Sequence, residues 1–244
     1  MANTLIDWTD KVWNPVTGCT KASAGCKNCY AERFTKELQD KGVEKYKDGF
    51  KVVKCHPECL YDPYKWKKPE KVFVNSMSDL FHKDVPFDFI RQVFQTMYDN
   101  EQLVFQILTK RAERLLECDP LLKWTNNIWM GVSVENETVK YRIDLLRECH
   151  AKLKFLSIEP LIGSLGELNL KGIDWVIVGG ENAPEARPMK EEWVLDIQKQ
   201  CDEQNVFFFF KQWGGRTGHG SHLLKGKEYR EMPKYQLGFF ESLF

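Results

Sequence analysis

Val72-Phe-Val-Asn-Ser-Met-Ser-Asp79 joins a short, continuously apolar run to a polar stretch. A run of this length without polar interruption is typical of a strand buried on both faces, as in a parallel sheet covered by helices. The same succession of an apolar run and a polar end recurs along the chain. The other runs span residues 103–108, 128–134, 153–158, 175–178 and 206–210.

Amphipathic segments separate most of these strands. Apolar residues recur at helical spacing in 87–100, 136–150 and 190–204, and we expect a further helix over 30–38. Strands that alternate with helices predict βαβ units with right-handed crossovers. With one more strand within 7–14, the sequence predicts an α/β fold, a partial TIM-like (βα) barrel of about six to seven parallel strands.

The length of 244 residues suits one hydrophobic core, and no linker separates two domains. We therefore expect a single domain over 1–244. Two regions interrupt the alternation of strands and helices. One is a polar, lysine-rich insertion over about 42–70, and the other is a glycine-rich tail over about 214–244 that ends in the aromatic residues Phe239, Phe240 and Phe244.

Charge and hydropathy exclude several classes of protein. The 35 Lys and Arg residues balance the 35 Asp and Glu residues, so contact with nucleic acid must depend on a local basic surface. No apolar run approaches the roughly 20 residues that span a bilayer, and no secretory signal is recognisable. Eight cysteines without such a signal indicate reduced thiols. We expect a cytoplasmic protein that makes no contact with a membrane.

Polar and charged residues follow nearly every predicted strand. In parallel-stranded barrels the active site lies at the carboxyl ends of the strands. Helix capping explains part of this pattern, and a solvated basic patch could explain Lys110 beside Arg111 and Arg114, but neither explains a glutamate or lysine at nearly every strand end. We expect a shared pocket whose candidate residues are Ser78, Asp79, Lys110, Ser133, Glu135, Glu159 and Gly180.

Three cysteines lie within eleven residues, between the first predicted strand and the first predicted helix. The motif reads Cys19-x6-Cys26-x2-Cys29. Three closely spaced thiolates favour a metal centre. A cubane iron–sulfur cluster can be held by three cysteines, which leaves one iron open to a further ligand.

Other interpretations of the same cysteines stay open at this point. Structural zinc sites use four protein ligands, and Cys55, His56 or Cys59 could supply a fourth after folding. A redox-active or inert group of thiols is the third possibility. The position of the loop after the first strand of a barrel-like pattern favours iron and sulfide.

The cysteine loop and the βα pattern resemble the radical S-adenosylmethionine (SAM) superfamily. In that superfamily three cysteines bind a [4Fe–4S] cluster, and SAM occupies the open iron. The usual spacing is Cys-x3-Cys-x2-Cys, so only the first gap is longer here. The resemblance implies a partial barrel of the radical SAM type, a cluster on Cys19, Cys26 and Cys29, SAM as cofactor, and a reductant protein such as a flavodoxin or ferredoxin.

Over nearly its full length the chain also resembles phage Gp37/Gp68-type proteins. The matching segments include Trp13-Asn-Pro15, Trp66-Lys-Lys-Pro69, Leu108-Thr-Lys110, Ser157-Ile-Glu-Pro160 and Gly179-Gly-Glu181. The site is similar to that of spore photoproduct lyase, a radical SAM enzyme that reverses a thymine dimer in DNA. This similarity implies DNA with a damaged pyrimidine as partner. The hydrogen-donating cysteine of the lyase corresponds to Met77, which has no thiol hydrogen to donate.

The resemblance implies a contact with SAM for most of the candidate residues. The expected contacts are Ser78 and Asp79 with the amino-acid part, Lys110 with the carboxylate, Ser133 and Glu135 with a ribose hydroxyl, and Gly180 with the adenine or the substrate. Glu159 is expected to face the same pocket.

A lysine-rich aromatic stretch is the candidate surface for nucleic acid, because aromatic side chains stack on bases while lysines contact phosphates. It contains Tyr61, Tyr64, Lys65, Trp66, Lys67, Lys68 and Lys71. A surface loop with a buried tryptophan explains the same residues. Three functions follow: a radical SAM enzyme acting on a pyrimidine in DNA, a radical SAM enzyme acting on RNA or a nucleotide, and a non-enzymatic binding module stabilised by zinc or a cluster.

Overall fold

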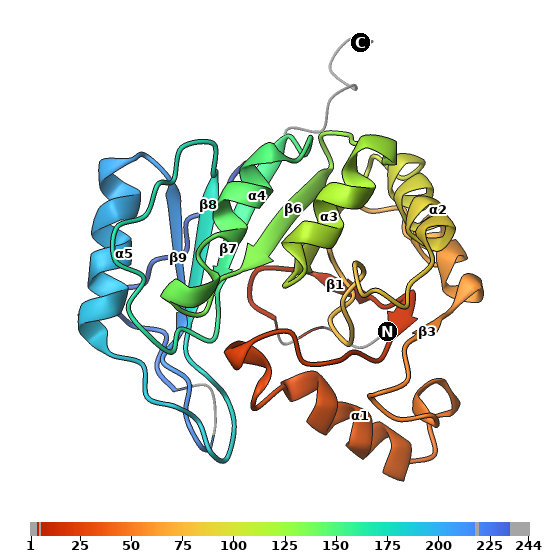
Figure 1. Ribbon diagram of the computed structural model, residues 1–244, viewed down its shortest axis with the longest axis horizontal. Helices are drawn as coiled ribbons and strands as arrows, with labels where there is room; N and C mark the ends of the chain where they lie inside the picture. The colour runs from red at the N-terminus through yellow and green to blue at the C-terminus, as the bar shows by residue number, and fades with distance from the viewer. Residues whose placement is uncertain (1–3, 5, 218–219, 235–244) are drawn as a thin grey trace.

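The computed structural model describes residues 4, 6–217 and 220–234 (Figure 1). Seven of their strands form one sheet in the order β1-β4-β5-β6-β7-β8-β9, and every neighbouring pair is parallel. The sheet curls into a half-barrel, which confirms the predicted α/β fold. The strands are β1 (Lys11–Trp13), β4 (Lys71–Val74), β5 (Val104–Thr109), β6 (Ile128–Ser133), β7 (Leu153–Ile158), β8 (Trp175–Gly179) and β9 (Phe207–Gln212).

Four helices lie along the outside of the curved sheet, and α1 lies apart from them, beyond the ends of the strands (Figure 1). The helices are α1 (Tyr30–Asp40), α2 (Phe87–Tyr98), α3 (Ala112–Cys118), α4 (Arg142–Glu148) and α5 (Glu191–Glu203). The segment expected as one helix over 136–150 is instead a 3-10 turn, η6 (Glu137–Val139), followed by α4. Asn136 begins that turn, and its side chain accepts a hydrogen bond from the N–H of Thr138.

The insertion over 42–70 is built from short elements at the edge of the sheet. β3 (Lys54–Cys55) pairs antiparallel with β2 (Val16–Thr17), and the 3-10 turns η3 (Pro57–Tyr61) and η4 (Pro63–Lys65) pack against α2. The insertion also contains η2 (Glu44–Tyr46), whereas η1 (Ala24–Cys26) and η5 (Asp119–Leu121) lie outside it. In the tail, Arg230 forms a bridge with Phe209 of β9, whereas Phe239, Phe240 and Phe244 lie outside the described residues.

The concave face of the sheet changes character along the strands. Large rings pack together near the amino ends, among them Trp8, Phe73, Trp129, Phe155 and Trp175. Gly131 and Ser133 follow Trp129 along β6 by two and four residues, so they lie on the same face. Ser157 of β7 and Gly179 of β8 lie on this face as well. The carboxyl ends therefore leave this face small and polar. No helix in the described ranges is long and apolar enough to cross a membrane.

Candidate functional site

Charged side chains continue the concave face beyond the strand ends. Glu135, Glu159 and Glu181 each follow a residue of the concave face by two positions, namely Ser133, Ser157 and Gly179. Because side chains alternate between the faces of a sheet, all three glutamates continue the concave face. Glu159 accepts hydrogen bonds from Lys211 Nζ at 2.8 and 3.1 Å and from Gln212 Nε2 at 2.9 Å. Side chains from different strands thus meet at one edge of the sheet.

Glu135 anchors the first half of the cysteine loop to the end of β6. Its Oε1 accepts the backbone N–H of Gly25 at 2.9 Å, and its Oε2 lies 3.2 Å from a guanidinium nitrogen of Arg142. Both side chains are almost completely buried. A Cβ on Gly25 would stand 2.9 Å from the Glu135 carboxyl carbon, so a side chain at this position would displace the Glu135 carboxylate. Burial opposes ionisation, but the hydroxyl of Ser23, the Gly25 N–H and nearby cations outweigh it and lower the pKa of Glu135.

Glu181 anchors the second half of the loop to the end of β8. Asn28, which lies between Cys26 and Cys29, donates to Glu181 Oε2 at 3.0 Å. Arg187 binds the same carboxylate through two guanidinium nitrogens at 2.6 and 3.0 Å. These contacts outweigh the opposing effect of burial and lower the pKa of Glu181.

A third anchor holds the start of the loop beside the end of β5. Arg111 donates to the carbonyl of Thr20 at 2.8 Å and lies 3.8 Å from Cys19 Sγ. The buried ring of His82 forms a 2.8 Å hydrogen bond with the Thr20 hydroxyl. Gly18, with φ of +80°, has no room for a Cβ, which would stand 2.0 Å from the Val52 carbonyl oxygen. The loop is therefore held at three separated points across the strand ends.

The three cysteines of the loop are free and partly exposed. Burial, together with Asp79, raises the pKa of Cys19 to about 11, and burial also raises the pKa of Cys29. The Cys26 thiol contributes to both shifts and acts in the same direction as burial.

Within the described ranges, no group of three or more His, Cys, Asp or Glu side chains is arranged to hold a metal ion. Cys59 belongs to a different environment, where its sulfur accepts from Lys45 Nζ at 3.1 Å. The loop itself offers three thiols as donors, those of Cys19, Cys26 and Cys29.

Ser78 and Asp79 are engaged by the protein itself. The Ser78 hydroxyl donates to the Val16 carbonyl at 2.8 Å. Asp79 is buried and accepts from the Thr109 hydroxyl at 2.7 Å and from the backbone N–H groups of Phe81 and Lys110 at 3.0 and 3.1 Å. These bonds join the ends of β4 and β5, so the structure gives Asp79 a role in positioning Lys110.

Lys110 and Ser133 have polar groups that the rest of the described chain does not use. The Lys110 ammonium group has no hydrogen-bond or ion-pair partner among these residues. Its positive charge limits the rise in the pKa of Cys29 that burial causes, and it helps to lower the pKa of Glu135. The Ser133 hydroxyl is buried without a partner in the same part of the chain. The Lys110 ammonium group is therefore unpartnered on a partly exposed residue, and the Ser133 hydroxyl is unpartnered and buried.

Gly180 makes a close contact within the chain. A Cβ at this position would stand 1.8 Å from the Trp213 carbonyl oxygen. The Gly180 N–H donates to the Gln212 carbonyl at 2.9 Å, which continues the pairing of β8 with β9. The absence of a side chain therefore closes the sheet at this edge.

Several residues of the site were not among the sequence candidates. Glu181 and Lys211 carry the same signal as the others, a charged residue at a strand end, and that signal could have identified them. Tyr30 begins α1, and its hydroxyl donates to the Ser76 carbonyl. Of the arginine partners, Arg142 begins α4 and Arg187 lies in a loop, and no sequence pattern distinguishes either of them.

The comparisons with known proteins concern the whole chain. A family model with the description "Protein of unknown function (DUF5131)" matches residues 3–233. No curated protein and no solved structure matched. The matched span covers nearly the same length as the resemblance to phage Gp37/Gp68-type proteins. The chain belongs to the DUF5131 family.

Proposed function

We propose that this chain is a radical SAM enzyme in which Cys19, Cys26 and Cys29 hold a [4Fe–4S] cluster, and that it acts on a pyrimidine in DNA as a lyase. The observation that carries the proposal is the cysteine loop anchored at three points across the carboxyl ends of a parallel half-barrel. Active sites of parallel barrels lie at this end. DNA as the partner rests on the similarity to spore photoproduct lyase.

When bound, the cluster and SAM supply a one-electron cleavage that yields a 5′-deoxyadenosyl radical. The chain's own residues bind SAM and orient it. Lys110 offers an unpaired ammonium group to the SAM carboxylate, as a charge-assisted hydrogen bond. Ser133 offers a buried, unpartnered hydroxyl from the concave face. A flavodoxin or ferredoxin would deliver the electron.

The substrate step needs a hydrogen donor other than residue 77. Met77 is buried and has no thiol hydrogen. The reaction therefore departs from that of the lyase in the group that returns the hydrogen atom, or in its product.

Anaerobic reconstitution tests the proposed function directly. Protein loaded with iron and sulfide, reduced with dithionite and supplied with SAM should release 5′-deoxyadenosine. Ultraviolet-irradiated thymine-rich oligonucleotide should raise that yield and lose a photoproduct peak by mass spectrometry, and untreated oligonucleotide should not. A wild-type chain that takes up no iron–sulfur cluster refutes the enzyme class. Stimulation by RNA or a nucleotide instead of DNA refutes the substrate.

Lys110→Ala is expected to weaken SAM binding without loss of iron. A hydrogen bond to a charged group contributes about 1.5–3 kcal/mol, which corresponds to a roughly 10–100-fold increase in Kd. Calorimetry on reconstituted protein measures this effect, and Lys171→Ala, at an exposed position, serves as control. Wild-type affinity in Lys110→Ala would remove this residue from the SAM site.

A further inference from the structure

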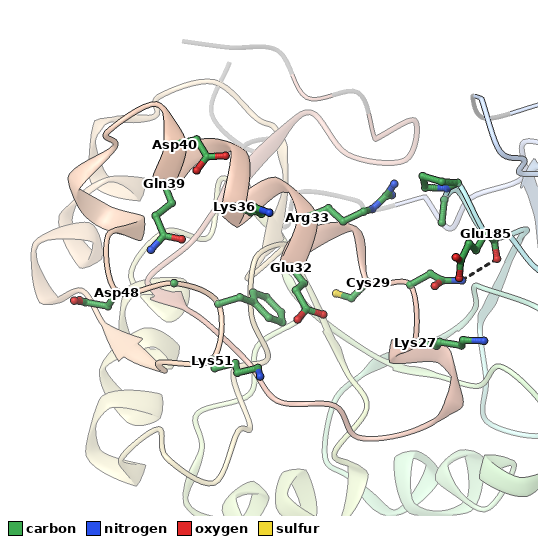
Figure 2. A pocket seen from close by; sticks show the side chains of 15 residues that line it. Lys27, Cys29, Glu32, Arg33, Lys36, Gln39, Asp40, Asp48, Lys51 and Glu185 are labelled. Atoms are coloured by element: carbon green, nitrogen blue, oxygen red, sulfur yellow. Dashed lines mark hydrogen bonds between the residues drawn. The ribbon is translucent and has the colours of Figure 1, made fainter.

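A groove of about 730 Å³ runs along α1 and is lined in part by Cys29 (Figure 2). One wall is the face of α1 that carries Glu32, Arg33 and Lys36. The other walls are formed by residues 48–51 and 183–185. The groove is therefore a large hollow in the described surface that borders directly on the cysteine loop.

Three lysines of this groove have no partner within the described chain. The ammonium groups of Lys27, Lys36 and Lys51 form no hydrogen bond or ion pair there, and all three residues are exposed. Arg33 adds a fourth cation, one of whose nitrogens donates to the Asn182 carbonyl at 2.5 Å. Cations held without counter-charges in a hollow favour an anionic ligand.

The carboxylates of the groove do not cancel this charge. Glu32 lies 3.9 Å from Lys21, and Asp48 lies 3.1 Å from Lys54, so lysines outside the lining already balance both. The remaining pair, Asp40 and Glu185, stand on opposite sides of the view in Figure 2. With those two carboxylates balanced from outside, the four cations of the lining exceed its two remaining carboxylates by two, in a chain whose formal net charge is zero.

The lysine-rich stretch 61–71 is placed less favourably for a substrate. Lys71 opens β4, and the carbonyl of Trp66 accepts from Gln102, which precedes β5. These contacts lie at the amino ends of the strands, whereas the cysteine loop crosses the carboxyl ends. Lys65 also pairs with Asp62 at 2.8 Å, so part of the charge of this stretch is already balanced.

We propose that the groove binds the sugar–phosphate backbone of a nucleic-acid chain, with Lys27, Lys36 and Lys51 each contacting a phosphate. Lysine binds phosphate as a point charge and needs no fixed geometry, which suits sequence-independent contact. This inference rests on the proposed function and places its substrate strand beside Cys29. DNA and RNA share the backbone chemistry, and the experiment distinguishes them.

The test compares two triple variants of equal charge change. Lys27→Gln/Lys36→Gln/Lys51→Gln alters the groove, and Lys65→Gln/Lys67→Gln/Lys68→Gln alters the stretch near the amino ends. Binding of single-stranded DNA and RNA oligonucleotides is followed by fluorescence anisotropy over a range of salt concentrations. Each phosphate contact on a single strand contributes about 0.7 to the slope of log K against log salt, so the groove variant should lose a slope of about 2 and roughly tenfold in affinity.

Outcomes for the groove and for the proposed function are separable. Thermal melting and iron content establish that each variant folds and carries the cluster. An unchanged salt slope in the groove variant, or an equal loss in the other triple variant, overturns the proposal. A wild-type chain without salt-dependent binding also overturns it. Failure of the wild-type chain to take up a cluster refutes the proposed function, and the slopes are then still informative about the groove. The oligonucleotide with the larger loss identifies DNA or RNA as the ligand.

Discussion

Alanine at position 19, 26 or 29 is expected to abolish the retention of iron by the reconstituted protein. A cubane cluster that is held by three cysteines loses one of its few protein ligands in each of Cys19→Ala, Cys26→Ala and Cys29→Ala. The anchored loop has no other thiol to substitute for the missing one. Iron and sulfide per chain, together with the visible absorption of the protein, measure the effect.

Two cysteines outside the loop provide a matched control. Cys59 contacts Lys45, and Cys55 lies in β3, paired with Val16. Cys55→Ala and Cys59→Ala are therefore expected to retain wild-type iron. Wild-type iron content in any single variant of the loop would remove that cysteine from the ligand set. Loss of iron in either control variant would make the substituted cysteine a candidate ligand.

Most of the sheet was predictable because its strands are buried on both faces. Run 175–178 is apolar throughout and run 103–108 is interrupted only by Gln106, and each coincides with a strand of the half-barrel to within one residue at either end. The sequence indicates a helix-like stretch at Cys118 but does not predict the bounds of the short helix α3. It has only seven residues and buries only Ala112, Leu115 and Cys118, and the charged residues Arg111 and Arg114 were interpreted as a basic patch. Tertiary packing forms this helix where local pattern is weak.

The site was predictable in its position but only partly in its contacts. Charged residues at strand ends were bound to meet, because parallel strands place their carboxyl ends at one edge. The partners of those residues could not be inferred. Gly25 and Glu135 are 110 residues apart, and Asn28 and Glu181 are 153 apart, with no motif to connect them.

The same limitation applies to two candidate residues whose contacts within the chain are not apparent from the sequence. Folding brings the Thr109 hydroxyl against Asp79, beside Lys110. The backbone of Trp213 packs against Gly180. A sequence identifies an acceptor or a missing side chain, but the neighbour that uses it is determined by the fold.

Glu135→Ala is expected to destabilise the protein by about 3–5 kcal/mol, because it leaves the buried guanidinium group of Arg142 without its counter-charge. The substitution also removes the acceptor of the Gly25 N–H. Urea unfolding measures the free energy. Hydrogen exchange over residues 20–29 should become faster in the variant, because the loop loses the anchor at the end of β6.

Two comparisons separate the buried charge from the anchor. Glu137 lies two residues away and is exposed, 3.8 Å from Lys140, so Glu137→Ala should change stability by no more than about 1 kcal/mol. Glu135→Met/Arg142→Met removes both charges and should recover much of the lost stability, while residues 20–29 still exchange rapidly. If Glu135→Ala costs less than about 1 kcal/mol, the ion pair does not stabilise the fold. If the double variant regains stability and slow exchange together, Glu135 is not the anchor of the cysteine loop.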